Sequence, residues 1–578
     1  METASPTGNL LRRTAAVLLL AIPLISLPLA WGRLGGEPIP FFGTAELLSF
    51  PLLGLFALAG ALAYGDWGAY RRDPRWRFFG TAQMLIVLVT LWLCFRGEVG
   101  WRGVGTTLVW LALPVLGAGL RPELERVMPF MAALTAGAML MSGATSVDFT
   151  GLAGNWNWTQ ALLFALLPGV FLATGDPRWR FWSVIGTAAV FLLIGWWHPA
   201  QLSRTAVIAA PLAALLLYLR RRLPVRRPFS VILWGFILLA AGFFALVWFC
   251  DFSDSRFQLW KGAADLAAAH GFSGCGMGRF GDLIPAFLPG KYFFTPFAAA
   301  WHPHPHSELL VWIAACGLAG GLFLAMLTGL ALGRKARSDR ELLAQWIFLF
   351  LLICGQTDVV CSTVSGGVWL LLAAGVAGGR RKRIAAATPG AWRTVPAAVL
   401  ALAAILLTIN HFCARLDYRR AQLALLKSDF VAARARLRRA VAREDDPETR
   451  YDLAELELLR FDAPEAAELS LNRLEKMRFG NFRHAWRLRA LAAARRRDYP
   501  VALDALDRER GNYPFSVINA GLLAAMLERS GAPAGELAAA RERLAILCRL
   551  RGIPPSQALT LAPAADDRPL NAKFAPGR

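Results

Sequence analysis

The stretch His302-Pro303-His304-Pro305-His306-Ser307-Glu308-Leu309-Leu310 stands directly before a long apolar segment. Histidines spaced two residues apart cannot share one face of a helix, and each proline disfavours the α conformation of the residue before it. We therefore predict an extended run at the mouth of a membrane-spanning helix. Ionisable groups at such a mouth indicate chemistry at a membrane surface.

The composition of the chain fits a membrane setting. Of its 578 residues 56% are hydrophobic, 21 are Trp, and the mean hydropathy is +0.44, which is too apolar for a soluble protein of this length. A net charge of +22 could indicate nucleic-acid binding, but Lys and Arg gather in short loops between apolar runs and act there as topology signals. We therefore expect membrane lipids and no nucleic acid as partners. The eight Cys show no spacing of a disulfide or metal framework.

Apolar runs predict an all-α, polytopic membrane domain over residues 1–413. Thirteen runs are long enough to cross a bilayer, or nearly so. They lie at about 14–32, 45–65, 79–95, 104–120, 128–145, 159–174, 182–197, 206–219, 229–250, 306–332, 343–361, 367–378 and 395–413. Because 343–378 could be a broken or re-entrant pair, we expect 12–13 transmembrane helices.

The basic residues predict the orientation of these spans. With the N-terminus in the cytoplasm, cytoplasmic segments hold 24 Lys and Arg and the opposite side holds 8. This difference follows the positive-inside rule of a bacterial inner membrane. An odd number of spans then places everything after Cys413, and the long loop 251–305, on the periplasmic side.

Residues 414–553 differ from the rest and predict a helical repeat domain. The turn sequences Asp429-Phe430, Asp462-Ala463-Pro464, Asp498-Tyr499-Pro500 and Gly531-Ala532-Pro533 recur at spacings of 33, 36 and 33 residues. Each is expected to lie between two helices, in a pattern that resembles tetratricopeptide repeats. Such arrays bind protein partners or extended chains. A generic stack of helical hairpins is the alternative, and residues 554–578 are predicted to be a disordered tail.

The loop 251–305 is too long to be a simple connection. It contains Arg256, Trp260 and the run Gly274-Cys275-Gly276-Met277-Gly278-Arg279-Phe280 before the histidines. Alternating glycines allow tight turns and close approach of a ligand to the backbone. The run follows no predicted strand and opens no βαβ unit, so it does not predict a dinucleotide site.

Four elements, in this order, resemble the O-antigen ligase/polymerase superfamily, which includes bacterial O-oligosaccharyltransferases. They are Gly154-Asn155-Trp156-Asn157-Trp158, Ser203-Arg204-Thr205-Ala206, the Arg256…Trp260…Gly274–Phe280 loop, and His304-Pro305-His306-Ser307-Glu308-Leu309-Leu310. The resemblance covers about residues 150–378. Ser307 departs from the Asn usual in the family, and Ala315 departs from an acidic residue.

The resemblance implies a glycosyltransferase that moves a glycan from a polyprenyl-pyrophosphate carrier to an acceptor hydroxyl in the periplasm. Arg204 and Arg256 would stabilise the leaving pyrophosphate, because guanidinium groups stay charged and bind phosphate oxygens in a fork. His306 would act as the base, with His304 as second choice. Arg279 is a third candidate cation. Donor-binding candidates are Asn155, Asn157, Trp260, Gly274, Gly276 and Gly278.

Other roles for these residues stay open. Arg204 could be a snorkelling interfacial residue, Arg256 a solvated loop charge, and His306 a structural histidine. Asn155 and Asn157 could cap the next helix, while Trp156 and Trp158 fit an aromatic belt. Asp358 could pair with a catalytic arginine. His302, His304 and His306 could bind a metal, but no cysteine neighbours them, and we predict neither a metal nor another cofactor.

Several functions remain possible from the sequence alone. The acceptor could be lipid A–core sugar, another O-unit or a protein hydroxyl, so O-antigen ligase, O-antigen polymerase and protein O-oligosaccharyltransferase all compete. A transporter or flippase of lipid-linked glycan is the alternative of another class, although it would be expected to place charges at mid-membrane. An inactive scaffold that recruits a partner through the repeats is a further non-enzyme alternative.

Overall fold

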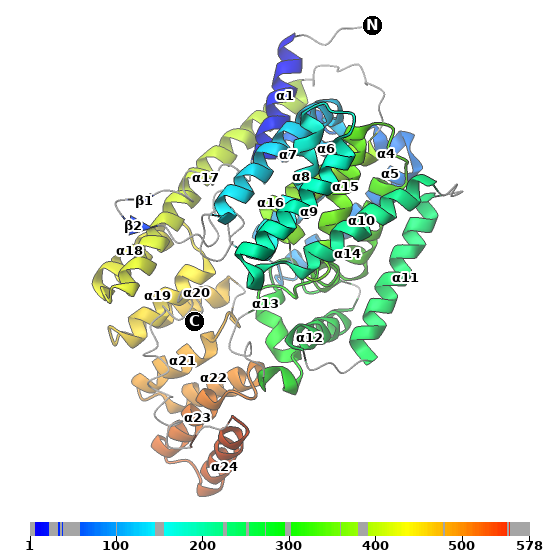
Figure 1. Cartoon of the computed structure of the whole chain (residues 1–578). Helices are drawn as coiled ribbons and strands as arrows, with labels where there is room; N and C mark the ends of the chain where they lie inside the picture. The colour runs from blue at the N-terminus through cyan, green and yellow to red at the C-terminus, as the bar shows by residue number, and fades with distance from the viewer. Residues whose placement is uncertain are drawn as a thin grey trace.

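The computed structural model describes residues 6–21, 33–34, 37–38, 58–99, 101–144, 155–222, 228–249, 254–271, 273–294, 302–358, 360–379, 391–477, 480–551 and 554. This part of the chain is almost entirely helical, as predicted (Figure 1). Its strands are β1 (Arg33–Leu34) and β2 (Glu37–Pro38), which form a two-residue antiparallel pair. The molecule has an apolar helical bundle, a folded loop below it, and a stack of helices that continues away from the bundle.

The bundle is built from twelve helices of the described chain. They are α1 (Pro6–Ala21), α4 (Ala69–Arg72), α5 (Pro74–Phe95), α6 (Trp101–Gly119), α7 (Arg121–Ala144), α8 (Trp156–Ala173), α9 (Trp179–Trp197), α10 (Arg204–Arg222), α11 (Pro228–Phe249), α14 (Glu308–Leu332), α15 (Asp339–Cys354) and α16 (Val364–Gly378). Short 3₁₀ turns, η2 (Pro199–Gln201) and η5 (Val360–Ser362), precede α10 and α16. A helix coincides with each predicted apolar run except 45–65, most of which lies outside the described residues.

Six helices of the described chain are long and apolar enough to cross a membrane. They are α5, α7, α8, α9, α14 and the part Val395–Leu426 of α17. Several other apolar helices are too short for this criterion. For example, α15 has 16 residues and rises about 24 Å, while a bilayer core is about 30 Å thick. The predicted total of 12–13 transmembrane helices therefore stays a prediction.

The centre of the bundle is α14, which packs against α5, α11 and α16. Large side chains that are fully buried around it include Trp76, Phe323, Phe348 and Trp369. By contrast, α5, α9, α10 and α11 carry many exposed apolar side chains, among them Leu88, Leu192, Ile208 and Leu238. Exposed apolar side chains in such number are expected on helices that face lipid.

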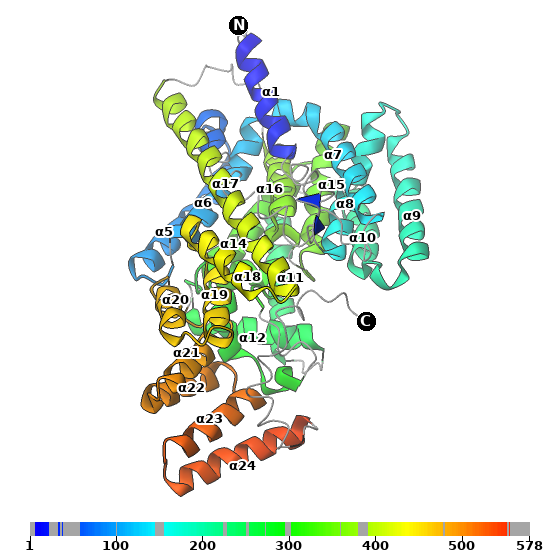
Figure 2. The ribbon, with the colours of Figure 1, turned by 90° about the vertical axis from the view of Figure 1, so that its left-hand side faces the viewer.

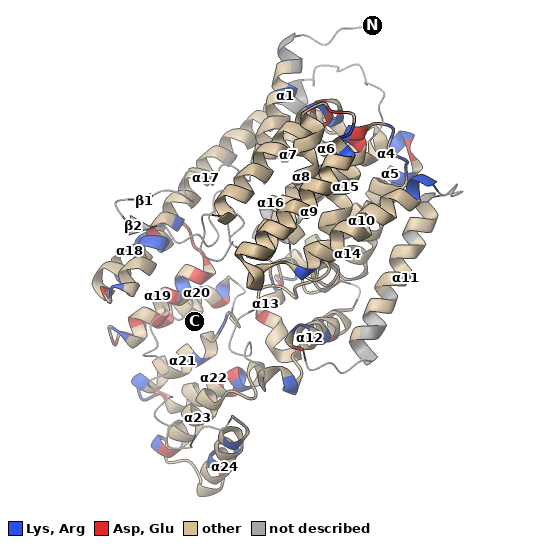
Figure 3. Cartoon of the chain, viewed as in Figure 1, with Lys and Arg blue, Asp and Glu red and all other residues tan. Residues whose placement is uncertain are grey.

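The charged ends of the bundle helices meet at one rim. Asp73 binds Arg75 at 2.8 Å and Arg334 at 3.3 Å, and Arg121 binds Glu341 at 3.3 Å. Further contacts at this rim join Arg12 to Glu123, Arg180 to Asp339, and Lys335 to the carbonyl of Arg221. The helices below this rim are nearly free of charged side chains (Figure 3). The loops counted as cytoplasmic from the sequence thus gather at the same end of the bundle.

The helical stack begins with the long helix α17 (Ala391–Leu426), which runs along the bundle and leaves it at the end opposite the charged rim (Figures 1 and 2). The other members are α18 (Phe430–Arg443), α19 (Pro447–Leu459), α20 (Pro464–Lys476), α21 (Ala485–Arg495), α22 (Tyr499–Asn512), α23 (Val517–Arg529) and α24 (Ala534–Arg551). Each helix packs on the next along the chain. We call residues 414–551 the helical stack.

Four turns of this stack share one backbone geometry. Ser428, Asp462, Arg497 and Gly531 have positive φ angles of 59°, 46°, 62° and 68°, and they are 34, 35 and 34 residues apart. The amide that follows three of these residues donates to the carbonyl five residues earlier, which is the bond of a Schellman helix end. A helix begins after each of the four turn sequences singled out from the pattern. The backbone conformation of these turns therefore recurs with nearly the same period as their sequence.

The loop between α11 and α14 is folded. It contains α12 (Ser255–His270), α13 (Phe280–Leu283), η3 (Ile284–Phe287) and η4 (Gly290–Phe294) around a small apolar core. The helical stack touches this loop, because α22 packs on η3 and the rings of Phe515 and Phe293 lie 5.5 Å apart. The stack and the loop therefore occupy the same side of the bundle.

Candidate functional site

The histidine run is held against the end of α15. The amide of Glu308 donates to the carbonyl of Gly355 at 2.7 Å, so the start of α14 is tied to the turn after α15. His306 has a φ of +54°, which is unusual for a residue with a side chain. Such strained conformations persist where the surrounding structure imposes them, and they gather at functional sites. The side chain of His306 keeps 29% of its surface exposed, so a ligand can reach it.

Asp358 joins His306 to α8. Its Oδ1 lies 3.3 Å from His306 Nδ1, and it accepts a hydrogen bond from Trp158 Nε1 at 3.0 Å. A carboxylate only accepts, so Nδ1 of His306 carries the proton and Nε2 is left with a lone pair. The described partners of Asp358 are thus His306 and Trp158, and its predicted pairing with an arginine stays a prediction. Trp158 is a hydrogen-bond donor in the site rather than a belt residue.

Thr357 joins the two helices that carry the predicted arginines. Its carbonyl accepts from Arg256 Nη1 at 3.2 Å, and its Oγ1 lies 2.7 Å from the hydroxyl of Thr205. Arg204 precedes Thr205 at the start of α10, where its exposed side chain makes no hydrogen bond or ion pair with the described residues. Thus Thr357 and Asp358, adjacent in sequence, bring together the starts of α8, α10, α12 and α14. Arg256 and His306 therefore contact this turn, and Arg204 is next in sequence to Thr205, which also contacts it.

The start of α10 has a second tie to α8. The side chain of Gln160 is fully buried, accepts from the amide of Ser203 at 2.8 Å and donates to the carbonyl of Gln201 at 2.7 Å. A buried amide that is satisfied on both ends fixes a connection well. This contact sets where Arg204 emerges from the bundle.

The other two histidines are packed beside His306. The ring of His304 lies 4.7 Å from that of His306 and 6.4 Å from Trp158. Burial and, to a smaller extent, the neighbouring His306 lower the pKa of His304 to about 3, so this ring is neutral near pH 7. His302 Nε2 binds the hydroxyl of Tyr292. His306 is thus the member of the run that combines exposure with a carboxylate partner.

The glycine run packs on a break in α14. Gly317 inside α14 has a φ of +59°, and the carbonyls of Ala314 and Ala315 accept from the amides of Cys275 and Gly276, both at 2.8 Å. A Cβ on Gly274 would come within 2.6 Å of the α14 backbone, and one on Gly276 within 2.1 Å of Val99. The structure therefore explains these two predicted donor-binding glycines by backbone packing. Gly278, with a φ of +83°, has open space around it.

Arg279 and Trp260 also serve the loop's own fold. Arg279 Nη1 donates to the carbonyl of Glu98 at 2.5 Å, which anchors the loop to the turn between α5 and α6. Trp260 is 7% exposed and packs between Phe243 and Phe257, with ring centroids 5.1 and 5.0 Å away. Neither residue contacts His306 or Asp358. The geometry therefore gives no support to Arg279 as a cation of the site or to Trp260 as a donor platform.

The role of residues 154–158 follows from the helix cap that Asn155 forms. Asn155 accepts from the amide of Asn157 at 2.8 Å and so caps α8, as the alternative prediction had it. No side-chain hydrogen bond of Asn157 is described, and Gly154 lies outside the described residues. The contribution of this element to the site is the placement of Trp158.

Asp282, in α13, is a buried carboxyl outside the site. It is 2% exposed, and neither of its side-chain oxygens has a hydrogen-bond partner among the residues that the structure describes. Burial raises its pKa to about 7, although Arg279 opposes the rise. The unfolded chain has an Asp pKa of about 3.9. The folded protein therefore loses stability as the pH rises from about 4 to 7, because its buried carboxyl must then give up a proton at a cost.

The variant Asp282→Asn is expected to remove this loss. Its gain in unfolding temperature over the unchanged protein should be larger at pH 8 than at pH 5, as measured by thermal unfolding in detergent. Asp504→Asn, at a carboxylate that is 62% exposed, is the control and should show no such difference. Equal gains for Asp282→Asn at both pH values would contradict a buried ionised carboxylate.

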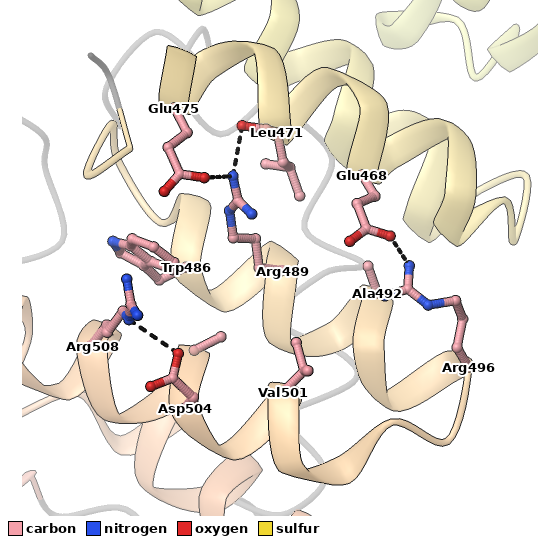
Figure 4. Close-up of a pocket in the computed structure, with 11 residues that line it drawn as sticks. Glu468, Leu471, Glu475, Trp486, Arg489, Ala492, Arg496, Val501, Asp504 and Arg508 are labelled. Carbon is pink, nitrogen blue, oxygen red and sulfur yellow. Dashed lines mark hydrogen bonds and ion pairs between the residues drawn. The ribbon is translucent and has the colours of Figure 1, made fainter. Parts of the chain in front are cut away.

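A separate cavity of about 200 Å³ lies in the helical stack between α20, α21 and α22 (Figure 4). The guanidinium carbons of Arg489 and Arg508 lie 5.2 and 4.7 Å from the centre of the Trp486 ring. Arg489 binds Glu475 at 2.8 Å, and Arg508 binds Asp504 at 3.1 Å. Because each of these cations already has a carboxylate, the cavity is not a ready anion site. None of the predicted site residues lines it.

Metal binding was an alternative for the histidine run. Within the described ranges, no group of three or more His, Cys, Asp or Glu side chains is placed to hold a metal ion. The three rings of the run instead contact Tyr292, Trp158 and Asp358.

No protein-family profile, curated protein or solved structure matches this chain. Its function is therefore inferred from its residues and their geometry. The residues that sequence reasoning missed are Thr357, which it did not name, and Trp158, which it placed in a belt. Thr357-Asp358 lies inside the predicted apolar run 343–361, and a polar pair that interrupts such a run was the available signal.

Proposed function

We propose that this chain is a membrane-embedded glycosyltransferase that moves a glycan from a polyprenyl-pyrophosphate carrier to an acceptor hydroxyl. The observation that carries this proposal is the turn at Thr357 and Asp358. It joins His306, Arg256 and the start of the helix that carries Arg204. A base beside two guanidinium groups suits a reaction in which a hydroxyl loses a proton and a pyrophosphate leaves.

The proposed step balances as follows in atoms and charge. The acceptor oxygen bonds to the anomeric carbon of the donor sugar, and its proton passes to Nε2 of His306. The bond between that carbon and the pyrophosphate oxygen breaks, and the pyrophosphate leaves with the electron pair. Asp358 stabilises the imidazolium that forms, while Arg256 and Arg204 stabilise the leaving anion. No other cofactor is needed, since the donor is already activated.

The direct test is an assay of purified full-length protein with polyprenyl-pyrophosphate-linked glycan and candidate acceptors. These acceptors are a lipid A–core glycolipid, a second carrier-linked O-unit and a protein with exposed Ser and Thr. Transfer to the first indicates a ligase, to the second a polymerase, and to the third a protein O-oligosaccharyltransferase. Movement of donor across vesicles without transfer would instead support a flippase, and neither activity would support a scaffold.

We further propose that the bundle lies in a bacterial inner membrane and that the helical stack is a tetratricopeptide-like domain in the periplasm. Six long apolar helices and the single charged rim support the first part. The 34–35-residue recurrence of left-handed turn residues supports the second. In this position the stack is available to a protein partner or to an extended glycan.

A topology reporter tests this placement. A fusion after Lys427 should report the periplasm and one after Arg383 the cytoplasm, because α17 crosses between them and the charged rim faces inward. A reporter after Arg222, next to the rim, is the internal control and should report the cytoplasm. Cytoplasmic signals at both Arg383 and Lys427 would mean that α17 does not cross and that the stack faces the cell interior.

A further inference from the structure

The helical stack reaches the histidine run through a line of aromatic contacts. The ring of Phe515, between α22 and α23, lies 5.5 Å from Phe293, and Phe293 lies 5.9 Å from Tyr292. Tyr292 lies 5.6 Å from His302 and also hydrogen-bonds it. His302 in turn lies 6.3 Å from His306. All four separations are within the range in which aromatic rings attract one another.

The two central residues of this line, Tyr292 and Phe293, are buried and closely packed. Tyr292 is 1% and Phe293 3% exposed, and Tyr292 belongs to the apolar core of the loop. Phe515 also lies directly over η4, since a Cβ on Gly290 would come 3.2 Å from its ring. Because a protein interior is closely packed, a shift of the Phe515 ring displaces the rings of Phe293 and Tyr292 as well.

His306 depends on such support from both sides. On the side that follows in sequence, Glu308 is tied to Gly355, and Asp358 holds the His306 ring. On the preceding side, a hydrogen bond between Tyr292 and His302 helps to fix the segment. A residue with a φ of +54° needs both ends of its segment fixed, because its own backbone preference opposes that conformation.

We infer that the helical stack is a positioning element of the candidate site, acting through Phe515, Phe293, Tyr292 and His302 on His306. An effect of the helical stack on catalysis rests on the proposed function. The mechanical support of residues 302–310 by the stack does not depend on that function. The stack then does more than recruit a partner: whatever binds it and moves Phe515 alters the placement of the base. Phe515 and Tyr292 are positioning residues, since neither touches the reacting groups.

The structural part is tested by hydrogen exchange of the full-length protein in detergent. Phe515→Ala should speed amide exchange in peptides that cover 302–310 by about two- to tenfold, the range that the loss of one aromatic pair produces. Phe430→Ala is the matched control, because Phe430 is also half-buried in the stack but contacts Arg460 rather than the loop. Faster exchange confined to the stack, or an equal effect of Phe430→Ala at 302–310, would overturn the inference.

The catalytic part is tested by kinetics of glycan transfer. Phe515→Ala, which removes a ring contact, and Tyr292→Phe, which removes the hydrogen bond to His302, should each lower kcat about two- to tenfold with KM for the donor unchanged. Phe515→Tyr should keep kcat close to that of the unchanged protein, because it keeps the ring contact. A change in KM alone, or a loss of kcat in Phe515→Tyr as large as that in Phe515→Ala, would contradict positioning of the base. If the unchanged protein transfers no glycan, the proposed function fails, while the exchange experiment still decides whether the stack supports the histidine run.

Discussion

His306→Ala is expected to lower the turnover of glycan transfer by about 10²–10⁴-fold, the usual cost of losing a general base. His306 is the histidine of the run that is both exposed to a ligand and held by a carboxylate, Asp358. The measurement is single-turnover transfer from the lipid-linked donor by purified protein. Retention of the protein in the membrane fraction and an unchanged elution volume would establish that the variant is folded.

His302→Ala is the matched control for this prediction. It removes an imidazole four residues away that hydrogen-bonds Tyr292 and supports His306 in the role of a positioning residue, so the loss of turnover should be far smaller. A chelator should have little effect on the unchanged protein. Unchanged transfer by His306→Ala would remove this residue from the mechanism, and strong inhibition by a chelator would return the histidine run to a metal-binding role.

Much of the helical layout could be predicted because its signals are local. Apolar runs specify where α5, α7, α8 and α14 lie, and the turn sequences at Asp429, Asp462, Asp498 and Gly531 specify where helices of the stack begin. The number of full-length spans depends on more than these local signals. It depends on how far α10, α15 and α16 reach across the bundle, and neighbouring helices decide that.

The candidate site was predictable in its residues more than in its contacts. His306, Arg204 and Arg256 became candidates through the resemblance of the elements that contain them to the O-antigen ligase/polymerase superfamily, and their catalytic roles stay predictions. The partner of His306 depends on how α8, α14 and α15 pack, so the sequence could not say that Asp358 contacts this histidine. Likewise, the packing of Gly274 and Gly276 depends on the break at Gly317, more than forty residues later in the chain.

Substitution of Arg256 or Arg204 should also slow glycan transfer strongly. Arg256→Ala and Arg204→Ala are each expected to slow transfer by about ten- to a hundredfold or more, since a charge-assisted hydrogen bond contributes roughly 1.5–3 kcal/mol. Arg→Lys at either position should restore only part of the rate, because an ammonium group cannot bind two phosphate oxygens in a fork. The measurement is kcat/KM with the lipid-linked donor.

Lys261→Ala offers a control on the same helix as Arg256. Lys261 is a half-buried cation of α12 one and a half turns from Arg256, so its removal changes the charge of the loop equally without touching the turn at Thr357. Its kcat/KM should stay close to that of the unchanged protein. If Arg256→Ala and Lys261→Ala slow transfer equally, the effect is one of general electrostatic attraction of the donor.

The double variant Arg204→Ala/Arg256→Ala tests whether both arginines act on the same anion. If it loses no more kcat/KM than either single variant, the two guanidinium groups act as one unit. If the losses of the two single variants multiply, the guanidinium groups act on separate groups of the donor.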